Sequence, residues 1–125
     1  MLIDTNVLID ALRDSRNRRD LLLSLAKNGY SLLISAINIA EVYAGLHPGE
    51  EAKTDAFLQI FRCIQVSTGI ARRAGMLRAE LRRTDRTYTL DDMIIAATAL
   101  SFNCPLLTED QRDFQIAGLT LFPLP

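Results

Sequence analysis

The chain begins Met1-Leu2-Ile3-Asp4-Thr5-Asn6, and the fold expected for it follows from this segment. Its apolar start predicts a short buried strand, and the apolar residues that follow, over 7–14, recur at helical spacing. Asp4 therefore falls where a strand ends and a helix begins. Ligands of open α/β sheets bind at this edge, so the next question is which other side chains arrive there.

Short apolar runs and amphipathic segments alternate along the rest of the chain. Because strands that alternate with helices form parallel sheets covered on both sides, the pattern predicts an α/β fold. Further strands are expected at 31–35, 63–66, 105–108 and 119–122, and further helices at 21–28, 37–45, 50–61, from 67 onward and at 93–100.

Length and composition limit the class of protein. A chain of 125 residues with 49% hydrophobic content predicts one domain with a substantial core. Charged residues interrupt each apolar run before it reaches the length of a membrane span, and no leader peptide is evident, so a cytoplasmic location is expected. Cys63 and Cys104 are expected to be two buried free thiols, because the chain has one His to join them in a zinc site.

The net charge of -1 conceals an arginine-rich segment. Residues 62–86 hold seven arginines and two acids, a net charge of +5. Arg78, Arg82 and Arg86 recur every four residues along one side of an expected helix, and arginine's planar fork suits phosphate groups. This stripe predicts a surface for a nucleic-acid backbone; the alternative is a solvated helix face without a partner.

Acidic residues gather at strand ends and helix starts. Asp4 follows the first strand, Glu41 lies two turns into the helix after the second, Asp92 opens the central helix, and Asp110 and Asp113 follow the fourth strand. Carboxylates brought to one sheet edge repel unless a divalent cation lies among them. Oxygen ligands suit Mg²⁺ or Mn²⁺, which can polarise a phosphoryl oxygen and supply hydroxide, so the set indicates phosphodiester chemistry.

Most of these acids also have a purely structural explanation. Asp4 fits a helix N-cap, Asp92 fits a capping box with Thr89, and Thr108 and Asp110 fit a turn with a cap. At this point both explanations stay open for each of them.

Capping cannot explain Glu41. Its spacing places it on the same helical stripe as Ile37 and Ala44, the side expected to face inward, where a carboxylate is costly unless it is paired. Asp91, about a hundred degrees round the helix from Asp92, is expected to face solvent.

Four segments carry recurring patterns: apolar-Asp-Thr-Asn, Ser followed by Ala-Glu and Gly, Asp-x-x-Ile-Ala-Ala-x-Ala, and Thr-x-Asp-x-x-Asp-Phe, at 1–9, 35–45, 92–99 and 108–114. Together they resemble the PIN-domain ribonucleases, and within these the VapC-type toxins of toxin–antitoxin pairs. The resemblance spans residues 1–125 as a single PIN domain. It selects Asp92 over Asp91 as the third acid. Asp110 stands where the family has Asn, so Asp110, Asp113 or both remain candidates for the fourth acid.

The resemblance implies a three-layer α/β/α sandwich with a mostly parallel sheet of about four to five strands, and Mg²⁺-dependent cleavage of RNA, often a structured RNA such as tRNA. It implies a VapB-type antitoxin as partner, homodimers within a larger toxin–antitoxin complex, and no membrane. The leucines at 21–25 are a candidate antitoxin groove. The implied roles are metal binding by Asp4, Glu41, Asp92 and Asp110, catalysis by these and Asp113, support by Thr5, Asn6 and Thr108, and RNA binding by Arg78, Arg82 and Arg86.

Two other functions are compatible with the acids. A phosphatase of the haloacid-dehalogenase type would use Asp4 as nucleophile, but it wants a second Asp shortly afterwards, where Asn6 stands. A catalytically silent PIN-fold module that only docks RNA or a protein is the non-enzymatic alternative. The full set of acids disfavours it, because keeping them together without a metal is electrostatically costly.

Overall fold

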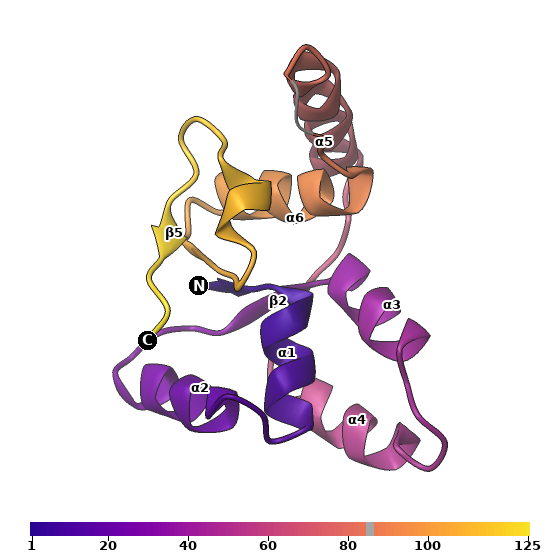
Figure 1. The fold of residues 1–125 in the computed structure, drawn as a ribbon, viewed down its shortest axis with the longest axis vertical. Coiled ribbons are helices and arrows are strands. Elements are labelled where there is room, and N and C mark those ends of the chain that lie inside the picture. Colours follow the sequence, from indigo (N-terminus) through magenta and orange to yellow (C-terminus); the bar gives the residue numbers. More distant parts are fainter. Residues whose placement is uncertain (85–86) are drawn as a thin grey trace.

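A computed structural model describes residues 1–84 and 87–125, in which strands and helices alternate (Figure 1). The elements are, in order, β1 (Leu2–Ile3), α1 (Thr5–Leu12), α2 (Arg18–Lys27), β2 (Leu33–Ser35), α3 (Ala36–Ala44), α4 (Glu51–Leu58), β3 (Arg62–Ile64), α5 (Thr68–Leu81), α6 (Leu90–Ser101), β4 (Leu106–Leu107), the 3-10 helix η1 (Gln111–Phe114) and β5 (Leu121–Phe122).

The strands form a parallel sheet in the order β3-β2-β1-β4-β5. β1 lies at its centre, where Leu2 pairs with Leu33 of β2 on one side and with Leu106 of β4 on the other. The connections out of β1 lead first to β2 and β3, and the later strands lie on the opposite side. The boundary between β1 and β4 is therefore the point where the topology reverses, which is the usual ligand site of such sheets.

Successive residues of the central strands enter two separate cores. Leu2, Leu33 and Leu106 pack with α5 and α6, whereas the next residue of each strand packs with α1, α2 and α4. Figure 1 shows α5 and α6 on one side of the sheet and α1, α2 and α4 on the other. The predicted α/β class and three-layer α/β/α sandwich are confirmed, with all the strands of the described sheet parallel.

Every expected element is present, although several begin or end elsewhere. α1 begins at Thr5 instead of residue 7, because the Asp4 side chain caps it. The expected strand at 63–66 covers Arg62–Ile64, and those at 105–108 and 119–122 shorten to two residues each.

The central helix α6 is buried as predicted, with six fully buried residues between 93 and 99. Cys63 and Cys104 are free, as expected, but they are half-buried and not fully enclosed. Among the helices in the described part of the chain, none has the length and apolar character to span a bilayer.

Candidate functional site

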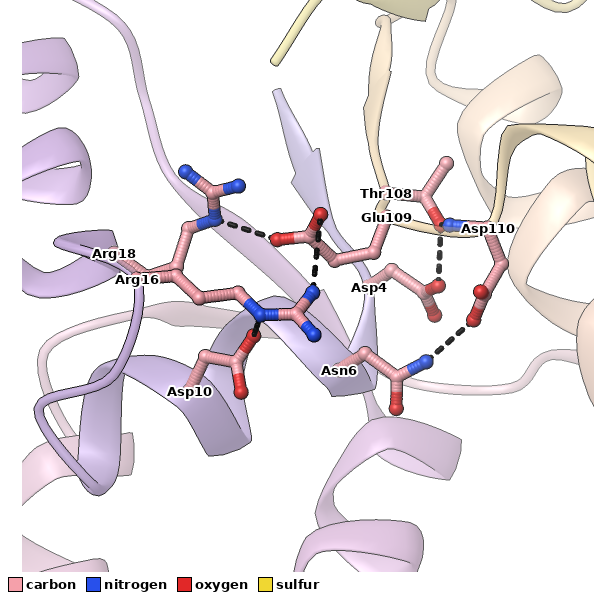
Figure 2. A network of polar contacts seen from close by, with 8 residues as sticks. All are labelled: Asp4, Asn6, Asp10, Arg16, Arg18, Thr108, Glu109 and Asp110. Atoms are coloured by element: carbon pink, nitrogen blue, oxygen red, sulfur yellow. Dashed lines mark hydrogen bonds and ion pairs between the residues drawn. The ribbon is translucent and has the colours of Figure 1, made fainter. Parts of the chain in front are cut away.

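Asp4 lies at the carboxyl end of β1, where the sheet topology reverses. Its side chain is 4% exposed; Oδ1 accepts a hydrogen bond of 2.8 Å from the Thr5 amide, and Oδ2 accepts one of 2.7 Å from the Thr108 hydroxyl (Figure 2). Burial, with smaller contributions from the nearby charges of Asp92 and Glu41, raises the pKa of Asp4 to about 6 against the lowering effect of these two hydrogen bonds. Asp4 is thus both a helix cap and a buried acid whose charged form is disfavoured by its surroundings.

Glu41 reaches the same place from α3. The Thr5 hydroxyl donates a 2.7 Å hydrogen bond to Glu41 Oε1 and accepts one of 2.9 Å from Asn38 Nδ2. Asn38 Oδ1 in turn accepts from the Ser35 amide at 2.7 Å, which completes a capping box at the start of α3. Because Asn38 is fully buried, the first turns of α1 and α3 are joined by a continuous buried network.

The expected inward stripe of α3 is displaced around the helix. The buried positions are Asn38 and Val42, Glu41 and Ile37 are half-buried, and Ala44 is exposed. Glu41 therefore lies at the border of the buried side, where its carboxylate has the partner that the cost of burial requires.

Asp92 is the third residue of α6. The Thr89 hydroxyl accepts from its backbone amide at 3.2 Å, so Thr89 caps the helix as expected. The Asp92 carboxyl is half-buried, and burial raises its pKa to about 6, followed by repulsion from Asp113, Glu41 and Asp110. The neighbouring Asp91 is exposed, as its position on the helix predicted.

The turn after β4 completes the set. The buried Thr108 hydroxyl, besides donating to Asp4, accepts a 2.9 Å hydrogen bond from the Asp110 amide. Asn6 Nδ2 donates to Asp110 Oδ2 at 2.5 Å (Figure 2). Asp113, half-buried in η1, is near enough to raise the pKa of Asp92.

The five predicted acids therefore act on one another across a single region, the carboxylate edge: Asp4, Glu41, Asp92, Asp110 and Asp113. Within residues 1–84 and 87–125, no three His, Cys, Asp or Glu side chains lie close enough together to hold a metal ion unaided. Mg²⁺ does not require that, since it commonly takes one or two carboxylates and keeps several waters. Oxygen-only donors, two of them with raised pKa, fit such an ion.

The predicted arginine stripe is separate from these acids. Arg78 lies half-buried in the last turn of α5 and Arg82 is exposed at its C-cap. Neither forms an ion pair within the described residues, and Arg86 lies outside them. Figure 1 shows α5 projecting from the rest of the molecule.

Two features of the site were missed from the sequence. Asn38 has a local signal, since Ser35-x-x-Asn38 places an amide where a capping box wants a polar side chain. The ion pair between Arg18 and Glu109 has none, because its partners are 91 residues apart.

Residues 1–119 match the family model of the PIN domain. This chain belongs to the PIN-domain family. The protein named Ribonuclease VapC10 of Mycobacterium tuberculosis is 35% identical to this PIN-domain chain over all 125 residues, which cover 86% of that relative. Ribonuclease VapC19 of the same organism is 34% identical over 113 residues, 90% of either protein.

The solved structures similar to this PIN-domain chain include toxin–antitoxin complexes. VapBC2 from Rickettsia felis, bound to a DNA fragment from its promoter, superposes with a TM-score of 0.84 at 28% identity over 97% of this chain and 96% of that one. A toxin–antitoxin complex from Klebsiella pneumoniae gives a TM-score of 0.79 at 33% identity, over 95% and 94% of the two chains.

Proposed function

We propose that this PIN-domain chain is an endoribonuclease toxin of the VapC type, which cleaves RNA with a metal ion held by carboxylates. The observation that carries the proposal is the arrival of Asp4, Glu41 and Asp92 from three separate elements at the point where the sheet topology reverses. Relatives named ribonucleases, similar over most of their length, agree with it.

Asp4 and Asp92 are the principal ligands in this proposal, because burial raises the pKa of both and a bound cation would stabilise their charged forms. Glu41 would orient the attacking water or hold a second ion, and Asp110 or Asp113 would complete the site. Mg²⁺, or Mn²⁺ in its place, would supply Lewis-acid polarisation of the scissile phosphate and a hydroxide at neutral pH.

Small polar residues keep these carboxylates in place. Thr108 holds Asp4 Oδ2 and the Asp110 amide with one hydroxyl, Thr5 holds Glu41, and Asn6 holds Asp110. Such outer partners set the direction of ligand lone pairs, and their removal commonly costs about 10–100-fold in metal affinity or activity.

The proposed substrate is RNA, with a structured one such as tRNA favoured. Arg78 and Arg82 support this, because cations without carboxylate partners within the described residues are available to phosphate groups. Arg86 continues their spacing in the sequence.

The proposed inhibitor is a VapB-type antitoxin, bound in an apolar groove between α2 and α4. This α2–α4 groove is lined on the α2 side by Leu22 and Leu23 and on the other side by Phe57, Ile60 and Phe61. Leu23 is 55% exposed and Ile60 is 72% exposed, which is costly in water and suits an apolar segment of a partner. A homodimer within a larger complex is part of the same proposal.

The decisive experiment compares Asp4→Asn, Asp92→Asn and the parent for RNA cleavage in Mg²⁺ and in EDTA. Asn has nearly the same shape as Asp, so the variants should fold like the parent. Each should lose more activity than the roughly 10–100-fold that is typical when a residue holding a metal ligand in place is removed. Asp91→Asn is the matched control, since Asp91 is the exposed neighbour of Asp92. Parent-like cleavage by either folded variant contradicts the proposal and favours a silent docking module.

The α2–α4 groove has its own test. Leu23→Glu and Ile60→Glu keep the core intact and should weaken binding of the antitoxin while leaving RNA cleavage unchanged. Leu25 is unsuited to this test because it is 5% exposed and belongs to the core. Unchanged antitoxin affinity in both exposed variants rules out the groove.

A further inference from the structure

We infer that Arg18 is a positioning residue for the carboxylate edge, acting through Glu109 on the turn at 108–110. This inference rests on the proposed metal-dependent function. The juxtaposition that carries it is an ion pair between the start of α2 and a glutamate that lies between two residues of the site, Thr108 and Asp110.

The Arg18–Glu109 pair is close and largely enclosed. Arg18 Nε lies 2.5 Å from Glu109 Oε1, and the two side chains are 8% and 16% exposed. The other Glu109 oxygen lies 3.8 Å from Arg16, which also approaches Asp10 of α1 at 3.8 Å. Both oxygens of Glu109 therefore face arginines, and a contact of this kind is stronger than one at the surface.

A displacement of Glu109 would also shift its two neighbours in the chain, which belong to the site. Its predecessor Thr108 donates to Asp4, and its successor Asp110 accepts from Asn6. Figure 2 shows Glu109 directed towards Arg16 and Arg18, whereas Asp110 is directed towards Asn6. The two consecutive carboxylates thus point apart, and the arginines keep Glu109 from joining the acids of the site.

Local structure alone does not account for Arg18. As the first residue of α2 it puts a cation where the helix dipole favours an anion, and the helix has no side-chain cap. The connection before it places Asp14, Arg16 and Asn17 in the left-handed region at φ 55–56°, which Asp and Asn tolerate but which is unfavourable for Arg16. This connection brings both Arg16 and Arg18 to Glu109, so we attribute its unfavourable backbone to these long-range contacts.

The test measures Mn²⁺ affinity by the EPR signal of free Mn²⁺, for the parent, Arg18→Gln and Arg18→Lys. Removal of a positive charge near a cation site would by simple electrostatics tighten Mn²⁺ binding. A positioning role predicts the opposite sign: Arg18→Gln should weaken it by about 10-fold, with Arg18→Lys in between, because lysine keeps the charge but not Nε. RNA cleavage should need correspondingly more Mg²⁺ for half-maximal rate.

Arg13→Gln is the matched control. Arg13 lies at the other end of the same connection and pairs with Glu50 at 3.8 Å, away from the 108–110 turn. It should leave Mn²⁺ affinity unchanged.

Equal or tighter Mn²⁺ binding by folded Arg18→Gln overturns the positioning role, whatever its stability. If that variant does not fold, Arg18→Lys decides the matter, and parent-like affinity in it overturns the role. A parent that binds no Mn²⁺ overturns the proposed metal site itself, and that result is distinct from the other two.

Discussion

The carboxylate edge and the arginine end of α5 carry opposite charges in the proposed RNA-cleaving surface, and they are built in opposite ways. The acids come from several elements and are joined by buried hydrogen bonds between residues far apart in sequence. The arginines follow one another on a single projecting helix and have no carboxylate partners within the described residues. Changes at the edge should therefore have cooperative and large effects, whereas changes on α5 should have independent and small ones.

Among the residues that hold the acids without being proposed ligands, the largest effect is expected at Thr108. Thr108→Val keeps the shape but removes the hydrogen bonds to Asp4 Oδ2 and from the Asp110 amide. We expect Mn²⁺ affinity and RNA cleavage to fall by about 10–100-fold, measured by EPR titration and by cleavage rate.

Thr98→Val is its control, because the buried Thr98 hydroxyl donates to Ile94 O of its own helix, α6. Equal losses in the two variants would mean that any buried hydroxyl matters, and the distinction between edge and helix would be lost.

The next effect is expected on α5. Arg78→Gln and Arg82→Gln should each weaken RNA binding without changing sequence preference and lower the slope of log K against log salt by about 0.7–0.9. The slope is measured in an Asp4→Asn background, so that the RNA stays intact, and Lys27→Gln at the end of α2 serves as control. Loss of cleavage with unchanged RNA binding would show that these arginines do not bind RNA.

The smallest effect is a gain in stability. The pKa of Asp4 rises from 3.8 to about 6 in the fold, a penalty of about 3 kcal/mol at neutral pH. Asp4→Asn removes the charge but keeps one hydrogen-bond acceptor. Without metal, its free energy of unfolding at pH 7 should therefore be about 1 kcal/mol higher than that of the parent.

The sign of the pH dependence follows from the raised pKa. Folding favours protonated Asp4, so the penalty is fully present above pH 6 and disappears as the pH falls towards 3.8. Urea unfolding in EDTA should therefore show the advantage of Asp4→Asn shrinking over that range. An advantage that is constant with pH would assign it to packing instead of charge.

The sequence predicted the elements and the convergence because both follow from short-range patterns. The run into Asp4 marks a strand end, and Thr89 marks the cap before Asp92, so the placement of both acids was visible locally. The inward stripe predicted around Glu41 was wrong. It was based on apolar residues, whereas the residue of α3 that is fully buried, Asn38, is polar.

The rest depends on contacts that no local pattern encodes. Arg18 and Glu109 meet only after the sheet has formed, and each alone resembles a solvated surface charge in the sequence. The same applies to Ile60, which falls within the helix expected at 50–61 and instead lies beyond the end of α4, 72% exposed.

α2 also links the two proposed sites mechanically. Its first residue, Arg18, touches the turn that carries Thr108, and one turn later Leu22 lines the α2–α4 groove, a separation of about 6 Å along the axis. A helix is stiff over that length. A molecule bound in the groove would therefore displace the start of α2, and with it the turn at 108–110. Inhibition by this route would not require the molecule to contact the acids.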